Sequence, residues 1–101
     1  MALSADPMQA TFTSPIWRYP GAGSWHFITL PEDLARDLNA HAPKGGWGSV
    51  KVRVTIGTST WKTSVFPDKR YNSYILPVKK QVRSDEKLIA DNLVTVNISV
   101  V

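Results

Sequence analysis

The stretch GSVKVRVTIG at residues 48–57 carries the plainest structural signal in the chain. Val50, Val52, Val54 and Ile56 alternate with polar side chains, and a period of two places all four on one face of a β-strand. β-Branched residues favour strands, and Gly57 ends the run in a turn. The stretch therefore predicts a strand at residues 50–56 with one buried face, in a protein dominated by β-structure.

Alternating apolar residues and turn signals predict further strands on both sides of this one. These strands are expected at residues 10–19, 25–30, 60–66, 73–76 and 93–101. Pro15 lies inside the first of them. Because proline has no N–H to donate, it predicts an edge position or a bulge there.

Two helices are expected between the strands. Leu30, Leu34 and Leu38 recur every four positions, which indicates a helix beginning near Pro31 and ending near residues 41–43. A second, short helix is expected after Pro77 and through about residue 84.

The two halves of the chain resemble each other. The Leu-Pro pair at residues 30–31 recurs at 76–77, and the same offset maps the alternating apolar positions of residues 50–54 onto those of residues 96–100. Each half is then ordered strand, strand, Leu-Pro, helix, strand. Two such units predict a pseudo-duplicated, six-stranded β-barrel in which each half buries what the other cannot. Coincidence among valine-rich strands is the alternative.

The composition fits one small globular domain. The 101 residues are 43% hydrophobic and 20% charged, which suffices for a core without disulfides or metal. Residues 1–9 include small and polar residues with Pro7 and are expected to form a disordered tail, followed by a single domain at residues 10–101. No apolar run approaches the length of a membrane span, and the first residues lack the pattern of a secretory signal. We therefore expect a cytoplasmic protein.

Four motifs occur in order along the chain: WHFITLP at 25–31, GSVKVRVTIG at 48–57, WKTSVFP at 61–67 and YILPVKKQVR at 74–83. With them the chain resembles the bacterial domain-of-unknown-function family DUF1905 over about residues 10–100. The resemblance implies a mainly β fold of the double-split barrel kind with two short helices, and a bacterial origin. It implies no activity. Residues 90–92 depart from the Gly-Asp turn usual before the last strand, which leaves the geometry of that turn open.

Little in the sequence indicates catalysis. The absence of cysteine excludes disulfides, cysteine nucleophiles and thiolate metal sites. His26, which we expect to face solvent or an interface, and His41 at a helix end have no nucleophile context. The glycine-rich loop at residues 45–48 lacks a Walker lysine and leads into a strand rather than a helix. We therefore expect no enzyme, no cofactor and no metal site.

Basic residues and one loop tryptophan are the candidate binding residues. The formal net charge of +4 favours an anionic partner, although a charge of this size also keeps many small domains in solution. The candidate cations lie on or near the second helix and on the outward face of strand 50–56: Lys79, Lys80, Arg83, Lys51 and Arg53.

The four tryptophans are expected to be mostly buried. Trp47 lies among glycines, where packing over the barrel end is favoured over exposure for stacking because indole has a large apolar area. Trp17, Trp25 and Trp61 lie on strands and are expected in the core or over a barrel mouth.

These features predict a non-enzymatic binding module for a small anionic ligand or a protein partner. Trp47 would stack on the ligand, and the five cations would pair with its negative charge. The alternative is a weak nucleic-acid-binding domain that uses a basic face. Asp68, Asp85 and Glu86 interrupt that basic face.

Overall fold

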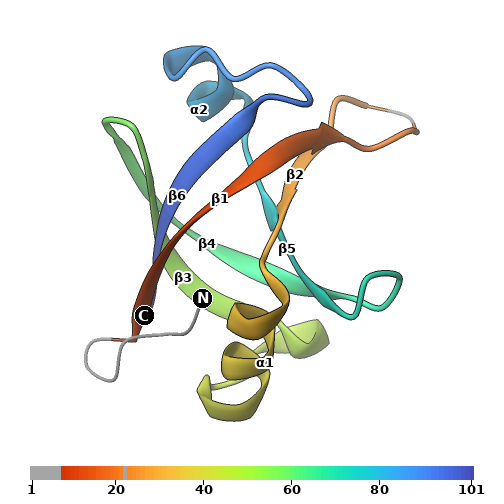
Figure 1. The fold of residues 1–101 in the computed structure, drawn as a ribbon, viewed down its shortest axis with the longest axis vertical. Coiled ribbons are helices and arrows are strands. Elements are labelled where there is room, and N and C mark those ends of the chain that lie inside the picture. Colours follow the sequence, from red (N-terminus) through yellow and green to blue (C-terminus); the bar gives the residue numbers. More distant parts are fainter. Residues whose placement is uncertain (1–7, 22) are drawn as a thin grey trace.

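The computed structural model describes residues 8–21 and 23–101, and within these residues six strands close into an antiparallel barrel with the order β1-β2-β5-β4-β3-β6 (Figure 1). The strands are β1 (Gln9–Arg18), β2 (His26–Thr29), β3 (Val50–Ile56), β4 (Ser59–Asp68), β5 (Ser73–Pro77) and β6 (Leu93–Val100). The helices are α1 (Glu32–His41) and α2 (Lys80–Asp85), with one 3-10 turn, η1 (Gly46–Gly48). The predicted mainly β, six-stranded barrel with two short helices is confirmed.

The start of the chain is only partly described. Residues 1–7, most of the expected tail, lie outside the described residues. Met8 packs against the core and Gln9 begins β1, one residue before the expected domain boundary. Among the described residues, no helix is both long and apolar enough to cross a membrane.

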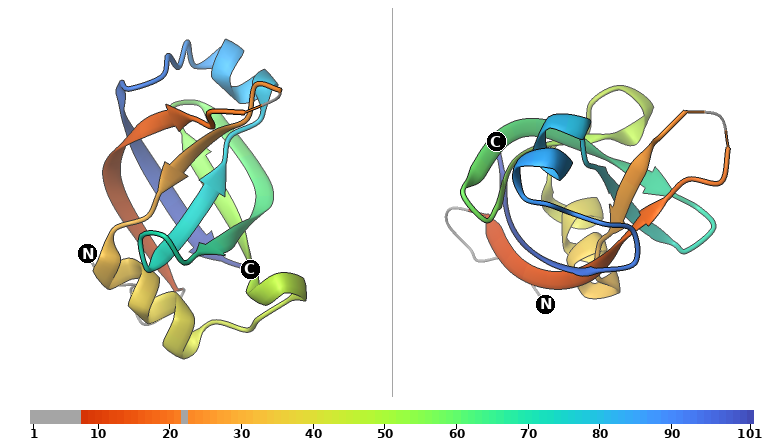
Figure 2. Two further views of the ribbon diagram at one scale, coloured as in Figure 1. Left: turned by 90° about the vertical axis from the view of Figure 1, so that its right-hand side faces the viewer. Right: turned by 90° about the horizontal axis from the view of Figure 1, so that it is seen from above.

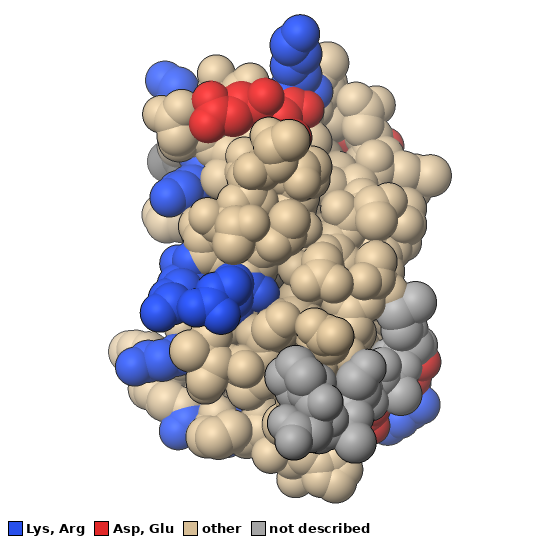
Figure 3. Space-filling view, turned by 90° about the vertical axis from the view of Figure 1, so that its left-hand side faces the viewer, with Lys and Arg blue, Asp and Glu red and all other residues tan. Residues whose placement is uncertain are grey.

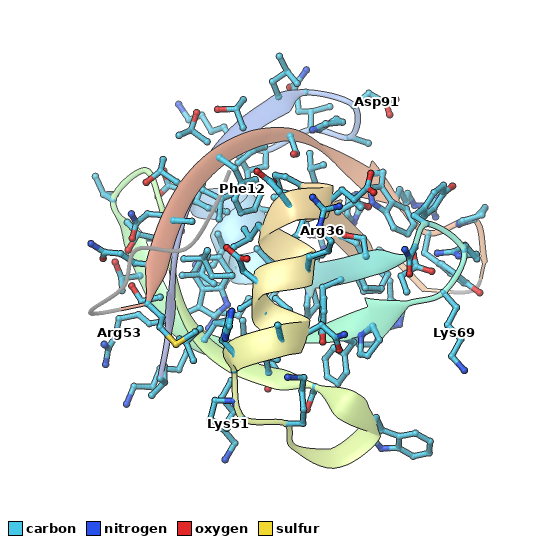
Figure 4. All side chains as sticks on the ribbon, turned by 60° about the horizontal axis from the view of Figure 1, so that its bottom comes forward. Phe12, Arg36, Lys51, Arg53, Lys69 and Asp91 are labelled. Carbon is cyan, nitrogen blue, oxygen red and sulfur yellow. The ribbon has the colours of Figure 1, made fainter. Side chains whose placement is uncertain are left out.

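The barrel interior is filled by aliphatic side chains. In β3 every second residue is buried, as the alternation in the sequence predicts. The largest fully buried side chains are all Ile, Leu or Val: Ile16, Ile28, Leu34, Leu38, Leu76, Ile98, Val50, Val52, Val54, Val65 and Val96. Phe12 is also buried and lies beside α1 (Figure 4). Small barrels have room inside only for packed side chains, and these residues occupy it.

The two helices close opposite ends of the barrel (Figure 2). Helix α1 buries Leu34 and Leu38, as its periodicity predicts, and the Lys44 ammonium caps its carboxyl end by donating to three main-chain carbonyls at 2.5–2.9 Å. At the other end, α2 buries Val82.

Helix α2 is fastened to the turn between β3 and β4 by Glu86, the residue after its last turn. Ser59 Oγ donates to the Glu86 carboxylate at 2.6 Å and Thr58 Oγ1 donates to it at 3.3 Å. The hydrogen bond from Ser59 is the main reason why the pKa of Glu86 lies below its usual value. Gly57 in this turn has a φ of 59°, and a β-carbon there would collide with the Glu86 carboxylate.

Pro15 occupies a position where β1 changes partner. Residues 9–15 of β1 pair with β6, and residues 16–18 pair with β2. Pro15 is opposite Leu93 at the end of the first ladder, so its missing N–H leaves no gap in the middle of a ladder. Within the described residues the barrel is closed and has no edge strand, so Pro15 lies at a change of strand partner and not at the expected edge or bulge.

The strand order agrees with two similar halves. Exchanging β1, β2 and β3 with β4, β5 and β6 leaves the cyclic order unchanged. Each half supplies two strands, a helix and a strand, in the expected order. A duplication within the sequence itself stays a prediction.

The packing of the interior predicts a sharp contrast between two aliphatic truncations. Ile28 is fully buried, so Ile28→Ala is expected to lower the free energy of unfolding by about 2–5 kcal/mol because it leaves a cavity. Leu93 is 73% exposed, so Leu93→Ala is expected to change the free energy of unfolding by less than about 0.5 kcal/mol. Urea denaturation measures both. Equal losses in the two variants would contradict the described interior.

Candidate functional site

The outer face of the β1–β2 hairpin carries a group of aromatic side chains. Ile16 and Ile28 are direct partners in the hairpin, and both point into the barrel. The next pair, Trp17 opposite Phe27, therefore points outward because side chains alternate along a strand. Trp25 is 59% exposed. The expectation that Trp17 and Trp25 lie in the core or over a barrel mouth is wrong, because smaller aliphatic residues fill the inner positions of this hairpin.

We call Trp17, Tyr19, Trp25 and Phe27 the aromatic cluster. Phe27 is its centre. The Trp25 ring is nearly parallel to the Phe27 ring, at 7° and with centroids 6.2 Å apart, and Tyr19 approaches Phe27 edge-on at 6.4 Å. Trp17 packs at a tilt on Phe27 at 5.1 Å, and its Nε1–H donates to Thr29 Oγ1 at 3.0 Å. These contacts hold each ring in a defined orientation on the outside of the barrel.

A guanidinium group extends the aromatic cluster toward the β4–β5 turn. The Arg70 Cζ atom lies 5.6 Å from the centroid of the Trp17 ring and 5.5 Å from that of Tyr71. Arg70 also donates to both carboxylate oxygens of the buried Asp68 at 3.1 Å each. This two-point contact fixes the plane of the guanidinium. Its side-chain hydrogen bonds lower the pKa of Asp68 and raise that of Arg70.

At the α2 end, the aromatic cluster meets two of the predicted cations. Ser24, Trp25, His26, Val78, Lys80 and Arg83 line a shallow hollow of about 220 Å³. Arg83 donates from Nε to the Val78 carbonyl and from Nη2 to the Ser24 carbonyl, both at 3.2 Å. His26 Nδ1 also donates to Ser24 O, at 2.8 Å. His26 is half-buried, and its expected place on solvent or at an interface stays a prediction. Arg83 thus joins α2 to the β1–β2 loop.

The hollow combines an aromatic surface with positive charge. Both partners of Arg83 are neutral carbonyls, so they leave the charge of the guanidinium intact. Lys80 is exposed beside it. Lys79, the residue that precedes the first turn of α2, is exposed but does not line the hollow.

Trp47 lies at the other end of the molecule. It belongs to η1, the yellow-green turn below β3 in Figure 1, whereas α2 lies above the barrel. Strand β3 separates η1 from the turn that contacts α2, and its seven residues span roughly 20 Å. The structure therefore does not bring Trp47 together with the cations of α2.

Trp47 is also not packed over the barrel end. It is 94% exposed and has a φ of 62°, between two glycines. The expectation of burial is wrong because the left-handed backbone of η1 directs the residue away from the core. The groove beside η1, of about 370 Å³ between α1 and the β4–β5 turn, is lined by Gly48 but not by Trp47.

Lys51 and Arg53 lie on another wall of the barrel. Both are exposed on the outer face of β3, and Arg53 is directly opposite Lys62 of β4. Figure 3 shows Lys and Arg side chains gathered along one edge of a face otherwise formed mostly by uncharged residues, and Figure 4 shows Lys51 and Arg53 pointing away from the barrel. In the cyclic strand order β3 stands opposite β2. The predicted cations therefore form two separate groups rather than one basic face.

Sequence reasoning missed the aromatic cluster, Arg70 and Tyr71 as site residues. A signal for the cluster was present: Trp25 and Phe27 share one face of a strand, and the small aliphatic Ile28 lies on the other. Trp61 follows the expectation, since it is half-buried and packs against the core. Among the described residues, no three His, Asp or Glu side chains form a group that could hold a metal ion.

The Asp68–Arg70 contact predicts a measurable dependence of stability on pH. Because folding lowers the pKa of Asp68, its ionised form stabilises the folded state above the unfolded pKa near 3.8, and this stabilisation is lost as the pH falls through the folded pKa. Urea denaturation between pH 7 and pH 2 measures the free energy of unfolding of wild type and of Asp68→Asn. The difference between the two values is expected to narrow below about pH 4.

Arg70→Met serves as the matched variant for this experiment. It removes the main cause of the lowered pKa of Asp68, so its unfolding free energy is expected to fall less steeply with acid than that of wild type. A gap between wild type and Asp68→Asn that stays constant down to pH 2 would contradict the assigned contact.

Comparison with known proteins identifies a family but no activity. The model of the domain of unknown function DUF1905 matches residues 12–98. No curated protein matches the chain. The family description assigns no reaction, ligand or partner. Since the match covers nearly the whole barrel, the chain belongs to the DUF1905 family.

Proposed function

We propose that this domain is a non-catalytic binding module for a planar anion, such as a nucleotide, held in the hollow at the α2 end of the aromatic cluster. The observation that carries the proposal is that Trp25, Lys80 and Arg83 line one hollow. A ring can stack on the indole while a negative group pairs with the cations.

The orientation of Trp25 supports stacking. One side of its indole is directed at Phe27, with an angle of 7° between the rings, and yet 59% of the residue is exposed. The contact with Phe27 restricts the indole before any ligand arrives, which reduces the entropy cost of binding. A large exposed aromatic with a restricted orientation is an effective surface for a second ring.

The charges near the hollow support an anion. Arg83 has neutral carbonyl partners, and the closest carboxylates along the chain are engaged elsewhere: Asp85 accepts from Gln81 Nε2 at 2.9 Å, and Glu86 accepts from the β3–β4 turn. Lys80 and Arg83 therefore attract a negative group into a site where aromatic surface is also present.

The proposal retains part of the predicted site and replaces the rest. It keeps Lys80 and Arg83 as anion-pairing residues and assigns stacking to Trp25 in place of Trp47. Lys79 contributes only at longer range. A protein partner for the same surface is the alternative, and it is an outcome of the test below.

The proposal is tested by titrating the protein with adenosine 5′-monophosphate, adenosine and inorganic phosphate, with calorimetry and tryptophan fluorescence as readouts. The monophosphate is expected to bind more tightly than either compound that lacks the charge or the ring. Trp25→Ala is expected to weaken its binding by about 1–3 kcal/mol, and Lys80→Gln by about 1.5 kcal/mol or more.

Two matched variants provide the controls. Trp47→Ala removes an indole at the other end of the barrel that is more exposed than Trp25, and Lys51→Gln removes an exposed lysine on the opposite wall. Both are expected to bind the monophosphate as wild type does. Equal losses in the control and the site variants, or no binding of the monophosphate at millimolar concentration, would contradict the proposal and favour a protein partner for this surface.

A further inference from the structure

The aromatic cluster continues beyond the hollow, and this continuation is the basis of an inference that rests on the proposed function. From Trp25 the planar groups run through Phe27, Trp17 and the Arg70 guanidinium to Tyr71, with centre-to-centre steps of 6.2, 5.1, 5.6 and 5.5 Å. We call these five groups the planar row. They come from β1, the β1–β2 loop, β2 and the β4–β5 turn, which the barrel brings side by side.

The planar row is too long for one nucleotide. Its four centre-to-centre steps of 5.1–6.2 Å make a path of roughly 20 Å from group to group, which corresponds to about four nucleotides of an extended single strand, at the lower end of the site sizes of small single-strand-binding barrels. A mononucleotide seated on Trp25 leaves Tyr71, at the far end and 64% exposed, uncovered.

Cations stand at both ends of the planar row. Lys80 and Arg83 flank Trp25 in the hollow. At the other end Lys69 precedes Arg70 and points away from the barrel on the β4–β5 turn (Figure 4). Arg70 itself is neutralised by Asp68, so it offers a flat stacking surface rather than a free charge.

We infer that the planar row is a track for single-stranded nucleic acid, with bases stacked on the aromatic groups and phosphates near Lys69, Lys80 and Arg83. Base stacking on aromatic faces requires bases that are not already paired, which excludes a duplex from the same contacts. The formal net charge of +4 has the sign that attracts a polyanion.

The length of the track is tested by fluorescence anisotropy with labelled oligothymidylates of two, four, eight and twelve nucleotides. Affinity is expected to rise between two and four nucleotides and to level off by eight. A hairpin duplex is expected to bind at least tenfold more weakly than the eight-nucleotide strand. With three neutralised phosphates, affinity is expected to fall by about 20-fold between 50 and 200 mM salt.

Variants at the far end of the row distinguish the track from the hollow. Tyr71→Ala is expected to lower the affinity for the eight-nucleotide strand by roughly 5- to 100-fold and to leave the affinity for adenosine monophosphate unchanged. Ile89→Ala removes a similarly exposed apolar side chain outside the row and is expected to leave both affinities unchanged. Circular dichroism confirms that each variant is folded.

The outcomes separate the two proposals. If the monophosphate binds but the eight-nucleotide strand binds no more tightly, or Tyr71→Ala has no effect on it, the track is wrong and the proposed function stands. If the duplex and the single strand bind equally, and Lys80→Gln weakens their binding whereas Tyr71→Ala does not, the track is wrong and the nucleic acid is held by charge attraction alone. If neither the nucleotide nor the strand binds, both proposals fail.

Discussion

The limited volume inside a six-stranded barrel decides on which face of the β1–β2 hairpin the large aromatic side chains lie. Among the described residues, the fully buried positions hold only Ile, Leu and Val, and buried positions alternate with less buried ones along β3 and around Ile16 and Ile28 in β1 and β2. Once Ile16 and Ile28 face each other inside the β1–β2 hairpin, Trp17 and Phe27 must face outward. The aromatic surface is thus a direct consequence of how the interior is filled, and a register shift of one residue would place two large rings in a space that cannot hold them.

The same closure separates the ends of the molecule. Helix α1 and η1 lie at one end, α2 at the other, and β3 spans the distance between them (Figure 1). Because Arg83 donates to the Ser24 carbonyl, which also accepts from His26, α2 is held against the β1–β2 loop, and its cations lie beside Trp25. Asp68 performs the corresponding role at the β4–β5 turn by fixing Arg70 between Trp17 and Tyr71. Two separate sets of polar contacts therefore hold charged groups against one aromatic surface.

Much of the fold follows from local patterns. The alternation at residues 50–56, the helical spacing of Leu34 and Leu38, and the recurrent Leu-Pro pairs predict the strands, α1 and the six-stranded barrel, because each pattern reports the period of one element. The burial of individual tryptophans does not follow in the same way. Trp25 and Phe27 alternate as well as Ile28 and Leu30 do, and the pattern alone leaves open which face is inside. Only the space available within the closed barrel decides between the two faces. The contact of Arg70 with Trp17 joins residues far apart in the sequence, so no local pattern could have indicated it.

The outer aromatic face at the α2 end, and not the exposed Trp47, is the proposed place of ligand binding. The most direct test is an NMR titration of the four indole N–H resonances with adenosine 5′-monophosphate, since each tryptophan reports its own surroundings. The account predicts that the Trp25 resonance shifts most, that Trp17 shifts less because its N–H donates to Thr29, and that Trp47 and Trp61 do not move. A titration in which Trp47 shifts and Trp25 does not would contradict it.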